Sequence, residues 1–442
     1  MSIHLPEDVK TILHTLQTAG HEAYAVGGCI RDSLLSRRPD DWDITTSARP
    51  EETKALFGKT IDTGIQHGTV TVMCHGRGYE VTTYRVDGEY EDGRHPKAVT
   101  FTASLAEDLK RRDFTINAMA YNEEEGLVDL FGGREDLERE IIRCVGDPDE
   151  RFEEDALRIM RAVRFSAQLG FQIEARTKEA IRGHADRLRQ VSAERIQTEL
   201  TKLVVSPNPD FLRTAWETGI TAVVLPEFDR LMEQAQNNPH HCFSVGEHTL
   251  CAMRKIRPDK CLRLAMLLHD VAKPLCLTTD ERGIDHFHGH AQKGERMAVQ
   301  ILKRLRYDNH TTELVSRLVK WHDTAIEPEK KAVRRAASRM GKELFPLVLE
   351  VKAADLAAQS DYQRAEKSEW LTKLWKLYAE IEREGDCLTL KDLAVCGRDL
   401  IEAGMAPGPQ LGSTLQRLLE IVLEDPEKNT KEYLLSLLPK ET

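Results

Sequence analysis

Apolar residues in the first third of the chain follow two different spacings. Residues 5–19 place apolar side chains near the helical period, for example at Val9, Ile12 and Leu16, so this segment is predicted to be a helix. Shorter apolar or alternating runs predict strands at residues 24–26, 41–46, 69–74, 79–84 and 141–145. The N-terminal part of the chain is therefore expected to combine a sheet with short helices.

Beyond residue 145 the spacing of apolar residues is helical. Residues 151–171 are predicted to form one long helix, in which Arg158, Arg161 and Arg164 recur every three residues beside the apolar face. Residues 192–203 are predicted to form another helix. Charged residues make up 31% of the chain and aromatic residues only 6%, a composition that favours a helix-rich protein over a sheet sandwich.

Composition and charge limit the class of protein further. The length of 442 residues suggests about three or four structural units. The formal net charge of −11 means that a nucleic-acid partner must meet a locally basic face. The nine cysteines form no C-x-x-C pair, so they indicate neither a thiolate zinc site nor a disulfide framework. No signal peptide and no apolar run of about 20 residues is present, so we expect a cytoplasmic protein without a membrane partner.

The first candidate site combines two carboxylates with a glycine turn. Asp41 and Asp43 are two residues apart, so in a strand they project from one face, where they can hold Mg²⁺. Gly27 and Gly28 precede a predicted helix, and a turn without side chains lets backbone N–H groups approach a phosphate. Arg31 follows one turn later. A surface turn with incidental acids is the alternative, but the combined pattern favours a metal-dependent nucleotide site.

The run GGCIRDSLLSRRPDDWDITT, residues 27–46, resembles the signature of the class II tRNA nucleotidyltransferases. This family contains the CCA-adding enzymes and bacterial poly(A) polymerases and belongs to the polymerase-β-like superfamily. The resemblance extends over residues 20–440. It implies an α+β fold with a small nucleotidyltransferase head built on a mixed sheet, followed by an all-helical neck, body, HD bundle and tail. It also implies catalysis by Asp41 and Asp43, with Glu80 as a third metal ligand unless Glu80 is an ordinary strand residue.

A second run, AEDLKRRDFTINAMAYN, matches another conserved block of the family. Arg111 and Arg112 can neutralise triphosphate oxygens, which is chemistry that guanidinium groups perform well. Asp113 can accept a hydrogen bond from a ribose hydroxyl, and Asn117 can bond to a sugar or base. A basic doublet is usually solvated surface, but the buried-looking residues that follow this one favour a nucleotide site.

The family's base-selection motif corresponds to Glu154, Asp155 and Arg158. A carboxylate and a guanidinium one helical turn apart on a rigid face can imitate the edge of a complementary base, so that protein replaces template. The alternative is a surface ion pair worth about 0.2–0.5 kcal/mol. Arg161 and Arg164, on the same predicted helix, are added to the nucleotide-binding set.

A loop is predicted at residues 85–97, because the run RVDGEYEDGRHPK contains two glycines, a proline and mixed charges. In the family this loop is needed to add the terminal A, and enzymes that add only CC shorten or lack it. The loop here carries Asp87, Asp92 and Arg94. Its presence favours full CCA addition, while an enzyme that adds only CC or only A, or a poly(A) polymerase, remains an alternative.

Histidines gather after residue 240. His248, His269 with Asp270, and Asp355 follow the H…HD…D pattern of the HD phosphohydrolases. This resemblance implies a second divalent metal, Mn²⁺, Ni²⁺ or Co²⁺, at these four residues. His290 and His322 could bind another ion, and Lys273 could bind phosphate. A metal-dependent phosphohydrolase is thus the alternative function of a different class, and a structural remnant is a further reading of the same residues.

The resemblance divides the chain into four parts: a head at 1–145, a neck that selects nucleotides and binds RNA at 146–230, an HD domain at 231–380 and a tail at 381–442. The expected reaction is Mg²⁺-dependent, template-independent addition of CCA to tRNA 3′ ends, with release of pyrophosphate. The expected partners are tRNA, CTP and ATP. The sequence leaves the oligomeric state open.

Overall fold

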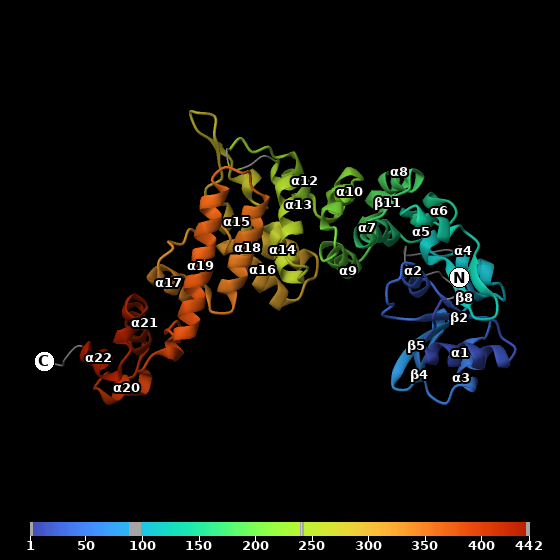
Figure 1. Cartoon of the computed structure of the whole chain (residues 1–442), viewed down its shortest axis with the longest axis horizontal. Coiled ribbons are helices and arrows are strands. Elements are labelled where there is room, and N and C mark those ends of the chain that lie inside the picture. The colour runs from blue at the N-terminus through green and yellow to red at the C-terminus, as the bar shows by residue number, and fades with distance from the viewer. Residues whose placement is uncertain (1–2, 88–98, 239, 241–242, 439–442) are drawn as a thin grey trace. The chain divides into compact units, whose positions relative to one another are not determined.

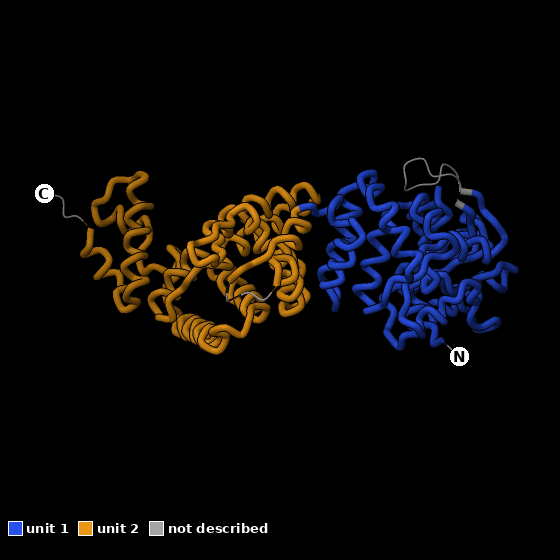
Figure 2. Tube along the Cα trace, turned by 90° about the horizontal axis from the view of Figure 1, so that it is seen from above, with its two compact units in different colours: residues 1–226 blue, residues 227–442 orange. Residues whose placement is uncertain are grey.

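The structure, a computed structural model, describes residues 3–87, 99–238, 240 and 243–438. The chain forms two compact units, Met1–Pro226 and Glu227–Thr442 (Figure 2). The predicted division into four parts stays a prediction. Asp92 and Arg94 of the predicted loop lie outside the described residues, and Asp87 ends a short strand.

A seven-stranded sheet forms the centre of the first unit. Its strands, in spatial order, are β3 (Thr60–Gly64), β4 (Thr69–Cys74), β5 (Arg77–Thr83), β2 (Asp43–Thr46), β1 (Ala23–Val26), β8 (Met119–Asn122) and β9 (Gly126–Asp129). β2 and β5 run parallel and the other neighbours antiparallel, so the predicted mixed sheet is confirmed. All four residues of β1 are buried, which explains why this strand reads as a continuous apolar run.

Short helices and strands surround this sheet and continue the first unit. The helices are α1 (Glu7–Thr18), α2 (Gly28–Leu34), α3 (Pro50–Leu56), α4 (Leu105–Lys110), α5 (Gly133–Glu138), α6 (Pro148–Glu154), α7 (Leu157–Leu169), α8 (Ala175–His184), α9 (Ala193–Val204), α10 (Leu212–Glu217) and α11 (Ile220–Val224). The minor strands are β6 (Arg85–Asp87), β7 (Val99–Phe101), β10 (Ile141–Ile142) and β11 (Gln172–Ile173). Figure 1 shows α1 and α3 beside β4 and β5.

Several predicted boundaries differ in the structure. The loop predicted at 85–97 is wrong for its first residues, because Arg85–Asp87 pair with β7 as strand β6. The helix predicted at 151–171 is wrong as one element, because Asp155 is extended and separates α6 from α7. Its carboxylate accepts a hydrogen bond from the Leu157 N–H at 3.0 Å and so satisfies a free donor at the start of the second helix. Asp41 precedes β2 instead of lying in it, and the strand predicted at 141–145 is only β10. The helices predicted at 5–19 and 192–203 are confirmed as α1 and α9.

The second unit is helical, as predicted, apart from one small hairpin of β12 (Thr278–Thr279) and β13 (Asp285–His286). Its helices are α12 (Pro226–Glu233), α13 (Val245–Lys255), α14 (Lys260–Leu268), α15 (His290–Arg304), α16 (Asn309–Trp321), α17 (Lys330–Met340), α18 (Leu344–Ala358), α19 (Arg364–Glu384), α20 (Gly397–Glu402), α21 (Pro409–Glu424) and α22 (Lys431–Ser436). Seven 3₁₀ turns complete the described part of the chain: Ile65–His67, Thr115–Asn117, Ala185–Gln190, Pro209–Phe211, Lys273–Leu275, Leu390–Asp392 and Pro426–Lys428.

The core of the second unit is a bundle in which α18 packs against α13, α14 and α16, and α16 also packs against α15. Val348, Leu349 and Phe345 of α18 are fully buried, and burying such side chains contributes about 1.5–3 kcal/mol each. Among the described residues, no helix is both long enough and apolar enough to cross a membrane.

Candidate active site and histidine cluster

Three predicted metal ligands line one cleft of the first unit, with a volume of about 1320 Å³. Asp43 begins β2, and Glu80 lies in β5, the strand parallel to it. Asp43 directly precedes Ile44 and Glu80 directly precedes Val81, and Ile44 and Val81 are paired across the two strands. Asp41 enters the same cleft from the segment before β2. Within the described residues, the three carboxylates do not form a group whose oxygens all lie within 4.8 Å of one another.

The carboxylates of this cleft affect one another's charge. Although the Asp43 side chain reaches solvent, loss of hydration raises its pKa above the ordinary value. The negative charge of Glu80 raises this pKa further, Arg112 lowers it, and Asp41 adds a smaller increase. Such mutually repelling oxygen donors suit a hard divalent cation, which relieves the repulsion, so the residues present fit Mg²⁺.

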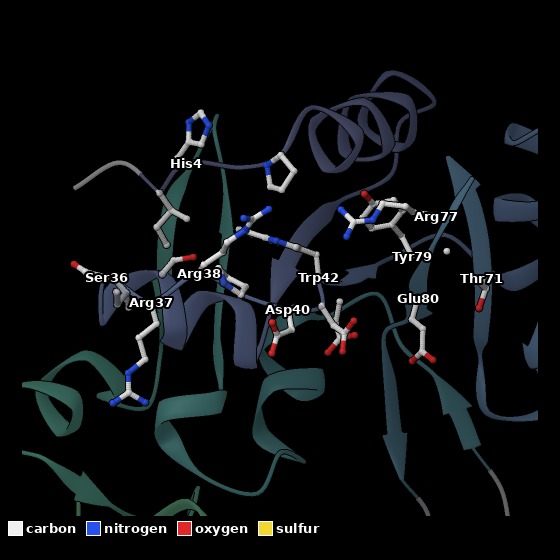
Figure 3. Close-up of a pocket in the computed structure, with 18 residues that line it drawn as sticks. His4, Ser36, Arg37, Arg38, Asp40, Trp42, Thr71, Arg77, Tyr79 and Glu80 are labelled. Atoms are coloured by element: carbon white, nitrogen blue, oxygen red, sulfur yellow. The ribbon is translucent and has the colours of Figure 1, made fainter. Parts of the chain in front are cut away.

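The cleft also contains residues that sequence analysis did not select. Asp40, Arg37 and Arg38 are among its lining residues, and Figure 3 shows the carboxylates of Asp40 and Glu80 turned to the same side. A signal was available, because the basic doublet and Asp40 immediately precede Asp41 in the run RRPDDWD. Arg37 and Arg38, like Arg111 and Arg112, can neutralise phosphate oxygens, so they were equally available as candidates.

The glycine turn lies against the second conserved block. Gly27 adopts a φ of +83°, and a Cβ at this position would lie 3.1 Å from Nη1 of Arg112 and 3.7 Å from the carbonyl oxygen of Asn117. The positive φ favours glycine at this position, and a larger residue would also displace the Arg112 guanidinium slightly. Arg112 lies beside the glycine turn, and its positive charge also lowers the pKa of Asp43.

Two further arginines of the predicted nucleotide-binding set, Arg31 and Arg111, are held by nearby polar groups. Arg31 donates from Nη1 to the Oδ1 of Asn117 at 2.7 Å, and its guanidinium lies 5.1 Å from the centre of the Phe165 ring. Arg111 donates to the buried carboxylate of Asp108 at 2.8 and 2.9 Å. Burial alone would raise the pKa of Asp108, but the guanidinium groups of Arg111 and Arg112 lower it below the ordinary value. These contacts hold the guanidinium groups of Arg31 and Arg111 in position.

Asp113 is buried and bonded within the protein. It accepts hydrogen bonds from Nε and Nη2 of Arg161 at 2.8 and 2.6 Å and from Nδ2 of Asn117 at 3.2 Å. Burial would raise the pKa of this carboxyl, yet Arg161 and Asn117 lower it to about 2. Asp113 therefore joins α7 to the turn that carries Asn117.

The residues of the predicted base-selection motif make separate contacts. Glu154 pairs with both Arg151 and Arg158. Arg158 also donates to the main-chain oxygens of Arg151 at 3.1 Å and Arg111 at 2.9 Å. Asp155 pairs with Arg195 of α9 at 2.8 Å. The interpretation of Asp155 and Arg158 as neighbours on one continuous helix is wrong, because Asp155 lies at the break; their role in selection stays a prediction.

A second ion pair joins α7 to α9. Arg164 lies 2.6 Å from the carboxylate of Glu199, and its guanidinium stacks 3.6 Å from the centre of the Phe165 ring. Burial lowers the pKa of Arg164 to about 10, although the charge of Glu199 opposes this. Arg195 lies close to a further block of the family's pattern but was not among the predicted site residues, and Glu199 was not predicted; their spacing of four on one helix face was the available signal.

In the second unit, six predicted ligands converge. They come from α13 (His248), the end of α14 (His269 and Asp270), the start of α15 (His290), the end of α16 (His322) and α18 (Asp355). Two groups have ligand atoms within 4.8 Å of one another, and Asp270 belongs to both: one group also contains His248 and His269, the other His290 and His322. Lys273 lies 2.8 Å from Asp270. The prediction that these histidines and aspartates lie close together is confirmed.

The four imidazoles of this cluster are oriented alike. The Nδ1 atoms of His269, His290 and His322 lie 2.7–2.8 Å from carbonyl oxygens three residues earlier, and that of His248 lies 3.3 Å from the Ala358 oxygen. Each Nε2 therefore faces the centre, the orientation that metal-binding histidines adopt. Burial lowers the pKa of His269, but Asp270 and Asp355 raise it to about 10. A donor set of imidazoles and carboxylates fits a divalent transition metal.

Comparison with known proteins agrees with this architecture. The family model described as "Poly A polymerase head domain" matches residues 23–143. Models for an RNA-binding region of polymerase A and for domain 2 of tRNA nucleotidyltransferases match residues 170–232 and 276–438. The fold and the head cleft define a nucleotidyltransferase with a polymerase-β-like head.

Relatives identify the family. The chain is 38% identical to a CCA-adding enzyme of Lactobacillus helveticus, over 96% of this chain and 94% of the relative, and 37% identical to that of Levilactobacillus brevis, over 98% of both. The structure of the Bacillus stearothermophilus CCA-adding enzyme in complex with CTP is 32% identical, with a TM-score of 0.74 and coverage of 97% and 95%. The chain belongs to the CCA-adding enzyme family.

Proposed function

We propose that this chain adds C, C and A in turn to the 3′ end of tRNA, using CTP and ATP and releasing pyrophosphate. The observation that carries the proposal is the cleft that Asp41, Asp43 and Glu80 line together, in the head of a chain 38% identical to a CCA-adding enzyme. Because its substrate is tRNA, we place its action in the cytoplasm.

Asp41, Asp43 and Glu80 would hold Mg²⁺. When bound, this ion supplies charge neutralisation for in-line attack of the tRNA 3′-hydroxyl on the α-phosphorus. Arg111 and Arg112 bind the triphosphate, and the N–H groups at Gly27 and Gly28 meet a phosphate oxygen without steric hindrance from a side chain. Arg31 supports this face through Asn117.

Nucleotide choice is assigned to the start of α7. Asp155 and Arg158 offer an acceptor and donors to the edge of the incoming base, and Glu154 holds the guanidinium of Arg158. Asp113 holds Arg161, and Glu199 holds Arg164, so the arginines of α7 keep fixed positions. A rigid protein surface of this kind discriminates between bases without a template.

The direct test is incubation of the purified chain with tRNAs that end in the discriminator base, in C and in CC, with labelled CTP or ATP. The products are resolved to one nucleotide. We expect all three tRNAs to end in CCA when both nucleotides are present. A product that stops at CC, addition of A alone to the CC-ended tRNA, or a run of A residues would assign the chain to the corresponding alternative activity.

The convergence of six ligands in the second unit favours a second function, metal-dependent hydrolysis of phosphoesters. His248, His269, Asp270 and Asp355 would hold Mn²⁺, Ni²⁺ or Co²⁺, with His290 and His322 completing a second position. When bound, such an ion supplies a Lewis acid and an activated water. Lys273, beside Asp270, is placed to meet a phosphate oxygen.

The test uses a phosphodiester and a phosphomonoester with each of these metals. The double variant His269→Ala, Asp270→Ala should lose hydrolysis and retain nucleotide addition, because the head ligands belong to the other unit. The matched control is His310→Ala, an exposed histidine of the same unit. Hydrolysis by wild type that persists in the double variant would contradict the assignment. Metal binding and thermal stabilisation without hydrolysis would instead indicate a structural site.

A further inference from the structure

A third group of potential metal ligands lies in the first unit and contains none of the cleft carboxylates. Asp8 of α1, Cys74 at the end of β4 and His75 in the following turn place a carboxylate oxygen, a thiol sulfur and an imidazole nitrogen all within 4.8 Å of one another. Within the described residues, Cys74 is the only cysteine in such a group.

The contacts inside this group are of ligand type. Nδ1 of His75 lies 2.7 Å from Oδ1 of Asp8 and 3.5 Å from Sγ of Cys74. Ligands at about 2.0–2.3 Å from a tetrahedral zinc ion lie roughly 3.3–3.7 Å apart, so the sulfur and nitrogen already have suitable spacing. The His75 side chain is 82% exposed and can rotate to widen its distance to Asp8.

The local fold aims these side chains at one point. His75 has a φ of +45° and Gly76 a φ of +83°, which turn the chain tightly between β4 and β5. The second oxygen of Asp8 accepts a hydrogen bond from the Tyr79 hydroxyl at 3.0 Å, so the carboxylate is already oriented toward the hairpin. Two segments more than sixty residues apart thus supply a mixed O, N, S donor set.

We infer that Asp8, Cys74 and His75 form a binding site for a thiophilic divalent metal, of which Zn²⁺ is the natural example, distinct from the Mg²⁺ and histidine-cluster sites. A carboxylate, an imidazole and a thiolate are all zinc ligands, and three protein ligands leave one position for water.

This site connects two segments of the chain that line the catalytic cleft. The hairpin that carries Cys74 and His75 continues in β5 to Glu80, while Ile3, His4 and Pro6, which precede α1, line the same cleft as Glu80. A metal ion bound to both α1 and the hairpin therefore fixes the positions of these two cleft-lining segments relative to each other. A ligand that binds only the folded head also raises its stability by mass action.

The test titrates the full chain, first stripped of metal by a chelator, with Co²⁺ alone. Sulfur-to-cobalt charge-transfer absorption in the near ultraviolet requires a thiolate ligand, so cobalt in the histidine cluster, which contains no cysteine, does not contribute. We expect wild type to develop this band with an amplitude that corresponds to one thiolate-bound Co²⁺ per chain, after any Co²⁺ taken up by the histidine cluster, and Zn²⁺ to abolish it. Cys74→Ser should lack the band, and His75→Asn, which keeps a residue that tolerates positive φ, should weaken it at least tenfold in apparent affinity.

The matched control is Cys396→Ser, because Cys396 is an exposed cysteine of the other unit. This variant and His269→Ala should retain the full band. Circular dichroism establishes that each variant is folded. Absence of the band in wild type, or an undiminished band in folded Cys74→Ser, would overturn the inference and leave a hydrogen-bonded cluster on the surface of the head.

Discussion

At the residue scale, the function of the head depends on a few charged groups whose neighbours set their properties. Asp43 has its pKa raised by loss of hydration and by Glu80, whereas Asp113, which is buried, has its pKa lowered to about 2 by its ion pair with Arg161. Two aspartates of one unit are thus adapted to different tasks. The first suits cation binding, and the second fixes an arginine.

Glu80→Gln tests the third carboxylate. Removing its charge should weaken Mg²⁺ binding, so nucleotide addition at limiting Mg²⁺ should fall by about 10–100-fold, the range seen when a group supporting a metal is lost. Activity should return in part at saturating Mg²⁺, because Asp41 and Asp43 remain. Glu51→Gln, at an exposed position of α3, is the control. An unchanged Mg²⁺ dependence in Glu80→Gln would remove this residue from the metal site.

Asp113→Asn tests the buried ion pair through pH. The folded pKa of about 2 lies below the ordinary value of 3.8, so ionised Asp113 stabilises the fold above about pH 4 and loses this effect as pH falls toward 2. The variant should be less stable than wild type by about 2 kcal/mol at pH 7 and by about half as much at pH 3. Urea unfolding, followed by hydrogen exchange of peptides from the head, measures this difference. A difference that does not change with pH would contradict the ionic explanation.

At the element scale, the sequence predicted local features well and long-range partners poorly. The spacing of Val9, Ile12 and Leu16 identified α1, because helical periodicity is contained in a short segment. The break at Asp155 was missed because the residues around it keep a helical pattern. The break depends on the turn at Leu157 and on Arg195, forty residues later. The pairs Arg161–Asp113 and Arg164–Glu199 are equally non-local, so spacing within one helix does not reveal them.

The candidate site shows the same division. Gly27, Asp41, Asp43 and Arg112 were selected from short motifs, and the structure places them around one region of the head. Their mutual arrangement required the sheet order, in which β2 lies between β1 and β5. No local pattern specifies that order, because it arises from the packing of the whole unit.

The break before α7 leads to a prediction about selection. If Asp155 and Arg158 contact the incoming base, Asp155→Ala or Arg158→Ala should reduce the preference for CTP over UTP by about 1–3 kcal/mol, the value of a bidentate polar contact. Arg195→Met should act in the same direction with a smaller effect, because it only releases Asp155. Arg189→Met, which breaks the exposed pair with Asp186, is the control. An unchanged CTP preference in both alanine variants would exclude these residues from selection.

At the scale of the whole molecule, two compact units carry chemically different donor sets. The head offers hard carboxylate oxygens suited to Mg²⁺, and the second unit offers imidazoles with a shared aspartate suited to a transition metal. Because no ligand is shared between them, loss of one set should leave the chemistry of the other intact. Nucleotide addition is therefore expected to depend on the head carboxylates alone.

The measurement that tests this assignment most directly is single-nucleotide-resolved extension of tRNA by wild type, Asp41→Asn and Asp43→Asn. We expect CCA ends from wild type and a loss of addition by orders of magnitude in both variants. Binding of tRNA, measured in parallel by gel shift, should be nearly unchanged. Turnover close to wild type in either variant would show that these carboxylates are not the catalytic metal ligands.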